Sequence, residues 1–168
     1  ISPGELAKVH AAIDSASGCL RCHAPGKGVD AGRCLSCHTA LQARITAGRG
    51  LHARPEYRKC ETCHIEHQGR DVDLRWWGAK GIAGFNHGDT GYALEGKHAA
   101  VECVRCHNPQ RVLDPAALAR GGGSAARTYL GLGTTCLSCH PDIHRGQFGT
   151  KDCAACHTLD TFKRAARF

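Results

Sequence analysis

Twelve cysteines fall into six pairs of the form Cys-x-x-Cys, and a histidine follows each pair directly. Cys-x-x-Cys-His is the covalent attachment sequence of c-type haem. The two thiols, one helical turn apart, add to the two vinyl groups of one porphyrin, and the adjacent imidazole reaches the iron as its proximal ligand. The sequence therefore predicts six haem c groups. The attachment cysteines are Cys19, Cys22, Cys34, Cys37, Cys60, Cys63, Cys103, Cys106, Cys136, Cys139, Cys153 and Cys156, and the proximal iron ligands are His23, His38, His64, His107, His140 and His157.

Other uses of paired cysteines fit this pattern less well. Zinc binds Cys-x-x-Cys pairs but does not require a histidine after the second cysteine. Thioredoxin-like redox pairs need a strand and a helix around them, and cysteines this close in sequence seldom form good structural disulfides. No thiol is left over once six haems are attached. Zinc binding, thiol redox chemistry and a disulfide scaffold are therefore minor alternatives.

Six histidines lie outside the motifs, and each of the six irons needs one more axial ligand. The chain contains no methionine, so the mixed His/Met ligation of higher-potential cytochromes is excluded. Bis-histidine ligation and low reduction potentials are therefore expected. The predicted distal iron ligands are His10, His52, His67, His87, His98 and His144.

The spacing of some histidines excludes certain pairings. His67 lies three residues after His64, and His144 lies four residues after His140. On a continuing helix, residues three or four apart project to the same side, whereas axial ligands approach one iron from opposite faces. Each of these two pairs is therefore predicted to serve two different haems and to bridge adjacent cofactors.

The elements that position these ligands are predicted to be short. The chain has 168 residues but only nine aromatic side chains, so a conventional core is doubtful and porphyrin is expected to fill the interior. We expect a mainly α fold with little regular secondary structure, in which short helices and long loops surround a chain of packed haems.

A first helix is predicted near the N-terminus, where Ser2-Pro3-Gly4-Glu5 resembles a capping box. Helical spacing places four residues on one face of this helix, namely Leu6, Val9, His10 and Ile13.

Capping residues and apolar spacing predict three further helices. They run from Ser36 to about Ala47, onward from Asp114-Pro115, and from Thr161 to Ala166 after an Asp160 cap. No alternating strand pattern of useful length is present. Gly121-Gly122-Gly123-Ser124 is expected to be a surface loop.

The widest gap between motifs, from residue 64 to residue 103, contains Trp76-Trp77-Gly78. This gap is the natural boundary between two trihaem halves, 1–75 and 76–168, which are expected to pack as one continuous unit. Both tryptophans are expected to be packing residues, with contact of one ring with a porphyrin edge as the alternative. Phe168 follows the last motif much as Phe85 follows the third, so another repeat is expected beyond the sequence given.

The second half carries a family resemblance. Phe85-Asn86-His87 and Leu94-Glu95-Gly96-Lys97-His98 lead into Cys103-Val104-Arg105-Cys106-His107, and the motifs at Cys136 and Cys153 follow. This order resembles the class III multihaem cytochromes c, a family of small low-potential proteins with bis-histidine haems. The resemblance implies a trihaem module in which His87 and His98 are distal ligands of two different haems and His144 is that of the third.

The first half departs from the family pattern. Only His10 stands upstream of its motifs, whereas His52 and His67 lie farther along the chain. The pairing of distal ligands with haems therefore stays open there.

The cofactor density predicts electron transfer rather than catalysis. Six haems in 168 residues must lie edge to edge, and two histidines on each iron leave no open position for a substrate. We expect a non-enzymatic electron carrier or conduit in anaerobic or metal-linked respiration. One alternative is a subunit of a polymerised extracellular cytochrome filament. The other is a multihaem reductase of a small nitrogen or sulfur oxyanion, although Cys-x-x-Cys-Lys is absent.

The formal charge of +7 is expected to balance haem propionates, through residues such as Arg21, Arg58, Lys59 and Arg105. Nucleic-acid binding and a transmembrane segment are not expected. Haem attachment occurs outside the cytoplasm, so a secreted periplasmic or extracellular chain is expected, its signal peptide already removed. The expected partners are redox proteins, such as other multihaem cytochromes or a membrane quinol-oxidising complex, or further copies of the chain.

Overall fold

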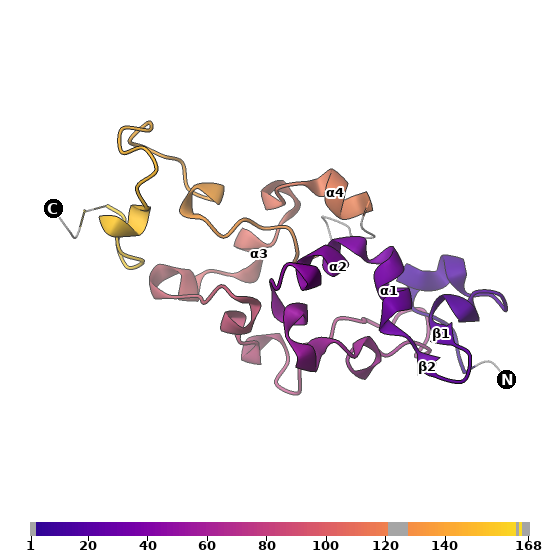
Figure 1. Cartoon of the computed structure of the whole chain (residues 1–168). Helices are drawn as coiled ribbons and strands as arrows, with labels where there is room; N and C mark the ends of the chain where they lie inside the picture. Colours follow the sequence, from indigo (N-terminus) through magenta and orange to yellow (C-terminus); the bar gives the residue numbers. More distant parts are fainter. Residues whose placement is uncertain (1–2, 121–127, 164, 166–168) are drawn as a thin grey trace. The chain divides into compact units, whose positions relative to one another are not determined.

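The computed structural model describes residues 3–120, 128–163 and 165, and Figure 1 shows the course of the chain. Contacts along the chain divide it into two compact units, residues 1–91 and 92–168, and each unit contains three of the six motifs. The sequence places the boundary after residue 75, but the segment that follows belongs to the first unit. Arg54 Nη1 lies 2.6 Å from Asp89 Oδ1, and the Trp77 ring packs edge-on against Phe85 with ring centroids 5.4 Å apart.

The first unit contains two α-helices, one strand pair and several 3-10 turns. Its helices are α1 (Ala31–Cys37) and α2 (Thr39–Thr46), and the strands β1 (His23–Ala24) and β2 (Gly28–Val29) pair antiparallel. The 3-10 turns are Lys8–Ile13, Cys19–Arg21, Leu51–Ala53, Pro55–Tyr57, Cys60–Thr62, Ile82–Gly84 and His87–Thr90. In the strand pair His23 lies opposite Val29, so the first motif ends in a tight hairpin.

The second unit is less regular still. It contains the short helices α3 (Cys103–Cys106) and α4 (Pro115–Arg120). Its 3-10 turns are Gly96–Ala100, Pro109–Arg111, Cys136–Ser138 and Cys153–Ala155. Loops join all of these elements, so the prediction of short helices with little regular secondary structure is confirmed.

The N-terminal helix is shorter than predicted. Gly4 has a φ of +130° and Ala7 is extended, so helical geometry begins only at Lys8, as a 3-10 turn. The cause is tertiary: the Lys8 N–H donates to the Arg70 carbonyl, and the Gly69 N–H donates to the Glu5 carbonyl. These bonds hold the segment extended against residues 66–70, and Ser2 lies outside the described residues.

The helix predicted from Ser36 to Ala47 is in fact two helices. Helix α1 begins at Ala31, where the Asp30 side chain accepts the Gly32 N–H, and ends at Cys37. His38 then leaves helical geometry, with φ −87° and ψ 55°, before α2 begins. The turn of the motif histidine thus interrupts an otherwise helical pattern.

The other two helix predictions have different outcomes. The helix after Asp114 is confirmed as α4, in which the Leu118 N–H donates to the Asp114 carbonyl. Residues 161–163 are not helical, so the predicted C-terminal helix is wrong there. Residues 164 and 166, and the predicted loop from Gly121 to Ser124, lie outside the described residues.

Few side chains are buried. Among the described residues the buried hydrophobic side chains are Leu6, Ala7, Val112 and Leu118, whereas sixteen large hydrophobic side chains are exposed. Neither unit therefore has a side-chain core of the usual kind for its length. Within the described part of the chain, no helix has the length and apolar character needed to cross a membrane.

Candidate functional site

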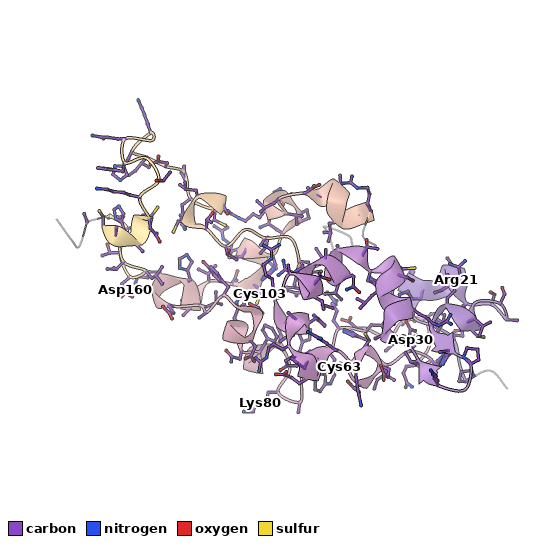
Figure 2. All side chains as sticks on the ribbon, viewed as in Figure 1. Arg21, Asp30, Cys63, Lys80, Cys103 and Asp160 are labelled. Atoms are coloured by element: carbon purple, nitrogen blue, oxygen red, sulfur yellow. The ribbon has the colours of Figure 1, made fainter. Side chains whose placement is uncertain are left out.

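Each attachment motif forms one helical turn. In the motifs ending at His64, His107, His140 and His157, the histidine N–H donates to the carbonyl of the first cysteine at 2.8 Å, and the same bond at His38 is 3.0 Å. The third motif contains the turn Cys60–Thr62 and the fourth contains α3, and Figure 2 labels one cysteine of each, Cys63 and Cys103. The first motif differs after Cys22, because His23 continues into β1.

Ten histidine rings lie in five pairs that have the same composition. In each of five pairs, one ring belongs to a motif histidine and the other to a histidine outside the motifs. The centroid separations are 6.0 Å for His10 and His38, 6.3 Å for His23 and His67, 6.1 Å for His52 and His64, 6.0 Å for His98 and His140, and 6.0 Å for His144 and His157.

This separation suits a metal ion between the rings. Imidazole nitrogens bind metals at about 2 Å, and a ring centroid lies roughly 1 Å behind its nitrogen, so two rings on opposite sides of one ion have centroids about 6 Å apart. Aromatic pairs in direct contact also span about 4.5–7 Å. Direct contact does not explain why every one of these pairs combines a motif histidine with an additional one, whereas shared ligation does.

The pairing agrees with the exclusion drawn from spacing. His67 lies beside His23 and not beside His64, whose partner is His52. Likewise His144 lies beside His157 while His140 has His98. Segments 64–67 and 140–144 therefore each contribute one histidine to each of two different ring pairs.

Two histidines remain after these five pairs. His87 belongs to the first unit and His107 to the second. Their roles as iron ligands stay predictions.

Hydrogen bonds hold the Nδ1 atoms of several of these histidines. His64 Nδ1–H donates to the Leu74 carbonyl at 2.6 Å, and His67 Nδ1–H donates to the Gly4 carbonyl at 3.0 Å. Occupied Nδ1 atoms leave Nε2 for a metal and fix the ring plane. Burial, and then neighbouring histidines, lower the pKa values of His38 and His52, which favours the neutral imidazole that metal binding requires.

The first cysteines of neighbouring motifs meet in both units. Cys34 lies within hydrogen-bonding reach of Cys60, and Cys136 lies within reach of Cys153. Burial, reinforced by Cys60, raises the pKa of the Cys34 thiol to about 11. All twelve cysteines are described, and none forms a disulfide. The second and third motifs of each unit are therefore direct neighbours.

No three histidine, cysteine, aspartate or glutamate side chains gather into a metal cluster within the described ranges. Structural zinc needs four such protein ligands, usually with thiolates among them. A haem iron needs only two, because the porphyrin nitrogens supply the other four. Paired imidazoles therefore match the two protein ligands that a haem iron needs.

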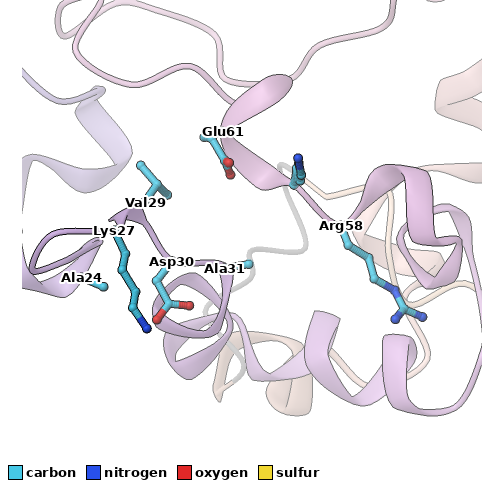
Figure 3. Close-up of a pocket in the computed structure, with 8 residues that line it drawn as sticks. Ala24, Lys27, Val29, Asp30, Ala31, Arg58 and Glu61 are labelled. Carbon is cyan, nitrogen blue, oxygen red and sulfur yellow. The ribbon is translucent and has the colours of Figure 1, made fainter.

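A surface pocket of about 420 Å³ opens in the first unit beside the motif that begins at Cys60. Figure 3 shows its lining, which comes from the loop after His23, the start of α1 and the approach to Cys60. Three cations line it beside two acids: Lys27, Arg58 and Lys59 with Asp30 and Glu61. Arg58 and Lys59 were predicted from the sequence to balance propionates, and their place at this pocket suits that role.

The sequence interpretation missed two residues that touch the predicted ligands. Glu66 Oε1 lies 2.5 Å from His10 Nδ1. The Phe162 ring stacks on His157 with centroids 4.4 Å apart and lies 5.8 Å from the His140 ring. The position of Glu66 between His64 and His67 was an available signal, whereas nothing in the sequence pointed to Phe162.

Gly4 provides a test of the contact between the N-terminal segment and His67. A Cβ at this position would lie 2.6 Å from the His67 carbonyl oxygen, in a backbone conformation that L residues avoid. We expect Gly4→Ala to destabilise the first unit by about 1–3 kcal/mol, as measured by guanidinium chloride unfolding. The control is Gly48→Ala, since Gly48 also has a positive φ but nothing lies within 4 Å. Equal losses in the two variants would contradict a role for the close approach.

Compared with known proteins, the chain matches no protein-family model, no curated protein and no solved structure. The class III resemblance therefore stays an expectation carried by the motifs and their order. The function is inferred from the chain's own residues and their geometry.

Proposed function

We propose that the protein transfers electrons through six closely spaced, covalently attached, low-potential c-type haems. The observation that carries this proposal is the set of five imidazole pairs, each joining a motif histidine to an additional one at 6.0–6.3 Å. When bound, each haem iron exchanges one electron between its ferric and ferrous states.

The thiols present fit six haems, and the ring pairs offer both axial ligands for five of them. Each motif offers two free thiols beside an imidazole, and the paired imidazoles supply axial ligands from opposite sides. The sixteen exposed large hydrophobic side chains offer apolar surface for porphyrin faces to cover. Leu137 and Val104, which lie inside two motifs, are among them at 63% and 66% exposure.

The contacts between motifs support transfer from haem to haem. Attachment cysteines of neighbouring motifs meet at Cys34 and Cys60, and again at Cys136 and Cys153. Because a thioether fixes a porphyrin edge within a few bonds of its cysteine, meeting cysteines bring two such edges together. Electron tunnelling falls steeply with edge separation, so this arrangement favours rapid exchange inside each unit.

Paired imidazoles also favour a carrier over an oxyanion reductase. A reductase needs an iron with an open coordination position. The groups in contact with these rings include the Phe162 ring, the backbone carbonyls of Leu74 and Gly4, and the Glu66 carboxylate. The hydrogen bonds among these groups orient the ligand rings.

The location and partners follow from the cofactor. Covalent haem attachment takes place outside the cytoplasm, so we infer a periplasmic or extracellular protein. Its partners would be other redox proteins, such as multihaem cytochromes or a membrane quinol-oxidising complex. Further copies of the chain in a filament are the alternative partner.

A redox titration followed by visible spectroscopy tests the proposed function. We expect uptake of six electrons per chain at low potentials, and low-spin spectra in both oxidation states that carbon monoxide leaves unchanged. A haem that binds carbon monoxide in the native protein would contradict the carrier function and favour a reductase.

The ring planes predict two spectroscopic classes of haem. The two rings cross at 73° both in the His10 and His38 pair and in the His98 and His140 pair. In the other three pairs the planes differ by only 21–29°. Crossed ligand planes make the iron orbitals nearly degenerate and give large-gmax signals, whereas near-parallel planes give rhombic ones. We expect low-temperature electron paramagnetic resonance of the oxidised protein to show both classes, and a single class would contradict the ligand geometry.

A further inference from the structure

Four consecutive residues in the first unit reach three ring pairs. His64 pairs with His52, and His67 pairs with His23. Between them, Glu66 bonds His10, whose ring lies beside His38. Segment 64–67 therefore connects all three candidate haem sites of this unit.

The Glu66 carboxylate is held at both oxygens. Oε1 lies 2.5 Å from His10 Nδ1, and Oε2 accepts the Ala7 N–H at 2.7 Å. Its side chain is only 21% exposed. The nearby guanidinium of Arg70 pairs with Asp14 and Glu5 instead. One oxygen of this carboxylate is therefore directed at the His10 imidazole, while the backbone holds the other.

Two other histidines of the first unit donate to uncharged acceptors. His64 and His67 donate to the neutral carbonyls of Leu74 and Gly4.

The second unit contains a matching crossed pair, His98 and His140, with the same 73° angle and 6.0 Å separation. In that unit the carboxylates of Asp142 and Asp152 accept backbone N–H groups, and no bond from a carboxylate to either ring of the crossed pair is seen among the described residues.

We propose that Glu66 is a positioning residue that lowers the reduction potential of the iron ligated by His10 and His38, below that of its counterpart at His98 and His140. This inference rests on the proposed function. A carboxylate that accepts the Nδ1–H bond pushes electron density toward Nε2 and makes the imidazole a stronger donor. A stronger donor stabilises ferric over ferrous iron, so the potential falls.

The consequence is a difference between two otherwise similar units. Both contain a crossed pair, and in both the first cysteines of the second and third motifs meet. A charge on one crossed pair alone makes the first unit harder to reduce at that site. Electrons entering the chain would then populate the crossed site of the second unit first.

The test compares Glu66→Gln with Glu5→Gln in the holoprotein. The amide is nearly isosteric and can still accept the Ala7 N–H, but it carries no charge. Glu5 lies in the same N-terminal segment, is 62% exposed, and its carboxylate pairs with Arg70 at 3.4 Å. Each variant is titrated potentiometrically while electron paramagnetic resonance follows the crossed and near-parallel haem classes.

We expect Glu66→Gln to raise the midpoint potential of one crossed-class haem and to leave the near-parallel class in place, with Glu5→Gln close to wild type. A shift in the near-parallel class, no shift, or an equal shift in both variants would overturn the role of Glu66. Haem content and carbon monoxide binding are measured on the same samples. Six low-spin haems without the predicted shift would refute Glu66 alone, whereas missing haems would refute the proposed function itself.

Discussion

Chain produced without haem attachment is expected to have no cooperative fold. Only four hydrophobic side chains are buried in the described residues, and the strand pair contains two residues per strand. So little burial cannot offset the conformational entropy lost when more than 150 residues are ordered. Under the proposed function, the thioethers and iron ligands would supply most of the stability.

Near-ultraviolet circular dichroism and urea unfolding, with the thiols kept reduced, measure this effect. The holoprotein should unfold in a sigmoidal transition, while the haem-free chain should lack near-ultraviolet signals and show no transition. The matched control is the holoprotein under the same reducing conditions. A haem-free chain with a sigmoidal transition of similar midpoint would show that side chains alone specify the fold.

The second large effect is expected from His144→Gly. The ring centroids of His144 and His157 lie 6.0 Å apart in a near-parallel pair. Removing the His144 imidazole should therefore leave the iron bound by His157 with one open axial position. One haem in six should become high-spin and bind carbon monoxide, and added imidazole should restore the low-spin state.

A nearby substitution provides the control for His144→Gly. Gln147→Ala lies on the same exposed loop and should leave all six haems low-spin. The electron paramagnetic resonance spectrum of His144→Gly should lose a near-parallel component. Loss of a crossed component instead would mean that His144 serves the iron of His140, against the observed pairing.

Local sequence pattern predicted the motif turns well and the ligand partners only in part. A Cys-x-x-Cys-His turn is closed by a bond within five residues, so it needs no tertiary information. His10, in contrast, lies nine residues before Cys19 but meets His38 of the second motif. The bonds between the N-terminal segment and residues 66–70 bring it there, and no spacing rule contains them.

Tertiary contacts also explain where helix boundaries and units differ from prediction. Helix α1 ends at Cys37 because His38 turns away from helical geometry, although the apolar pattern continues through it. Residues 76–91 belong to the first unit partly through the ion pair of Arg54 and Asp89, which are 35 positions apart in sequence. Composition gave no sign of this contact.

At the candidate site, the role of Glu66 likewise could not be predicted from the sequence pattern. Counting histidines and cysteines accounts for the predicted thioethers and axial ligands, but it contains no information on which ligand has a charged neighbour. The charged neighbour depends on a tertiary contact, because the N-terminal segment packs beside residues 66–70 and Glu66 there bonds both Ala7 and His10.

Intact mass spectrometry of the denatured 168-residue chain, produced in cells that attach haem c and analysed with a count of its free thiols, tests the central claim most directly. The proposed function predicts the mass of the chain plus six covalently bound haems, and no free thiol on any of the twelve cysteines. The unmodified chain mass, or a chain with disulfides in place of thioethers, would contradict it.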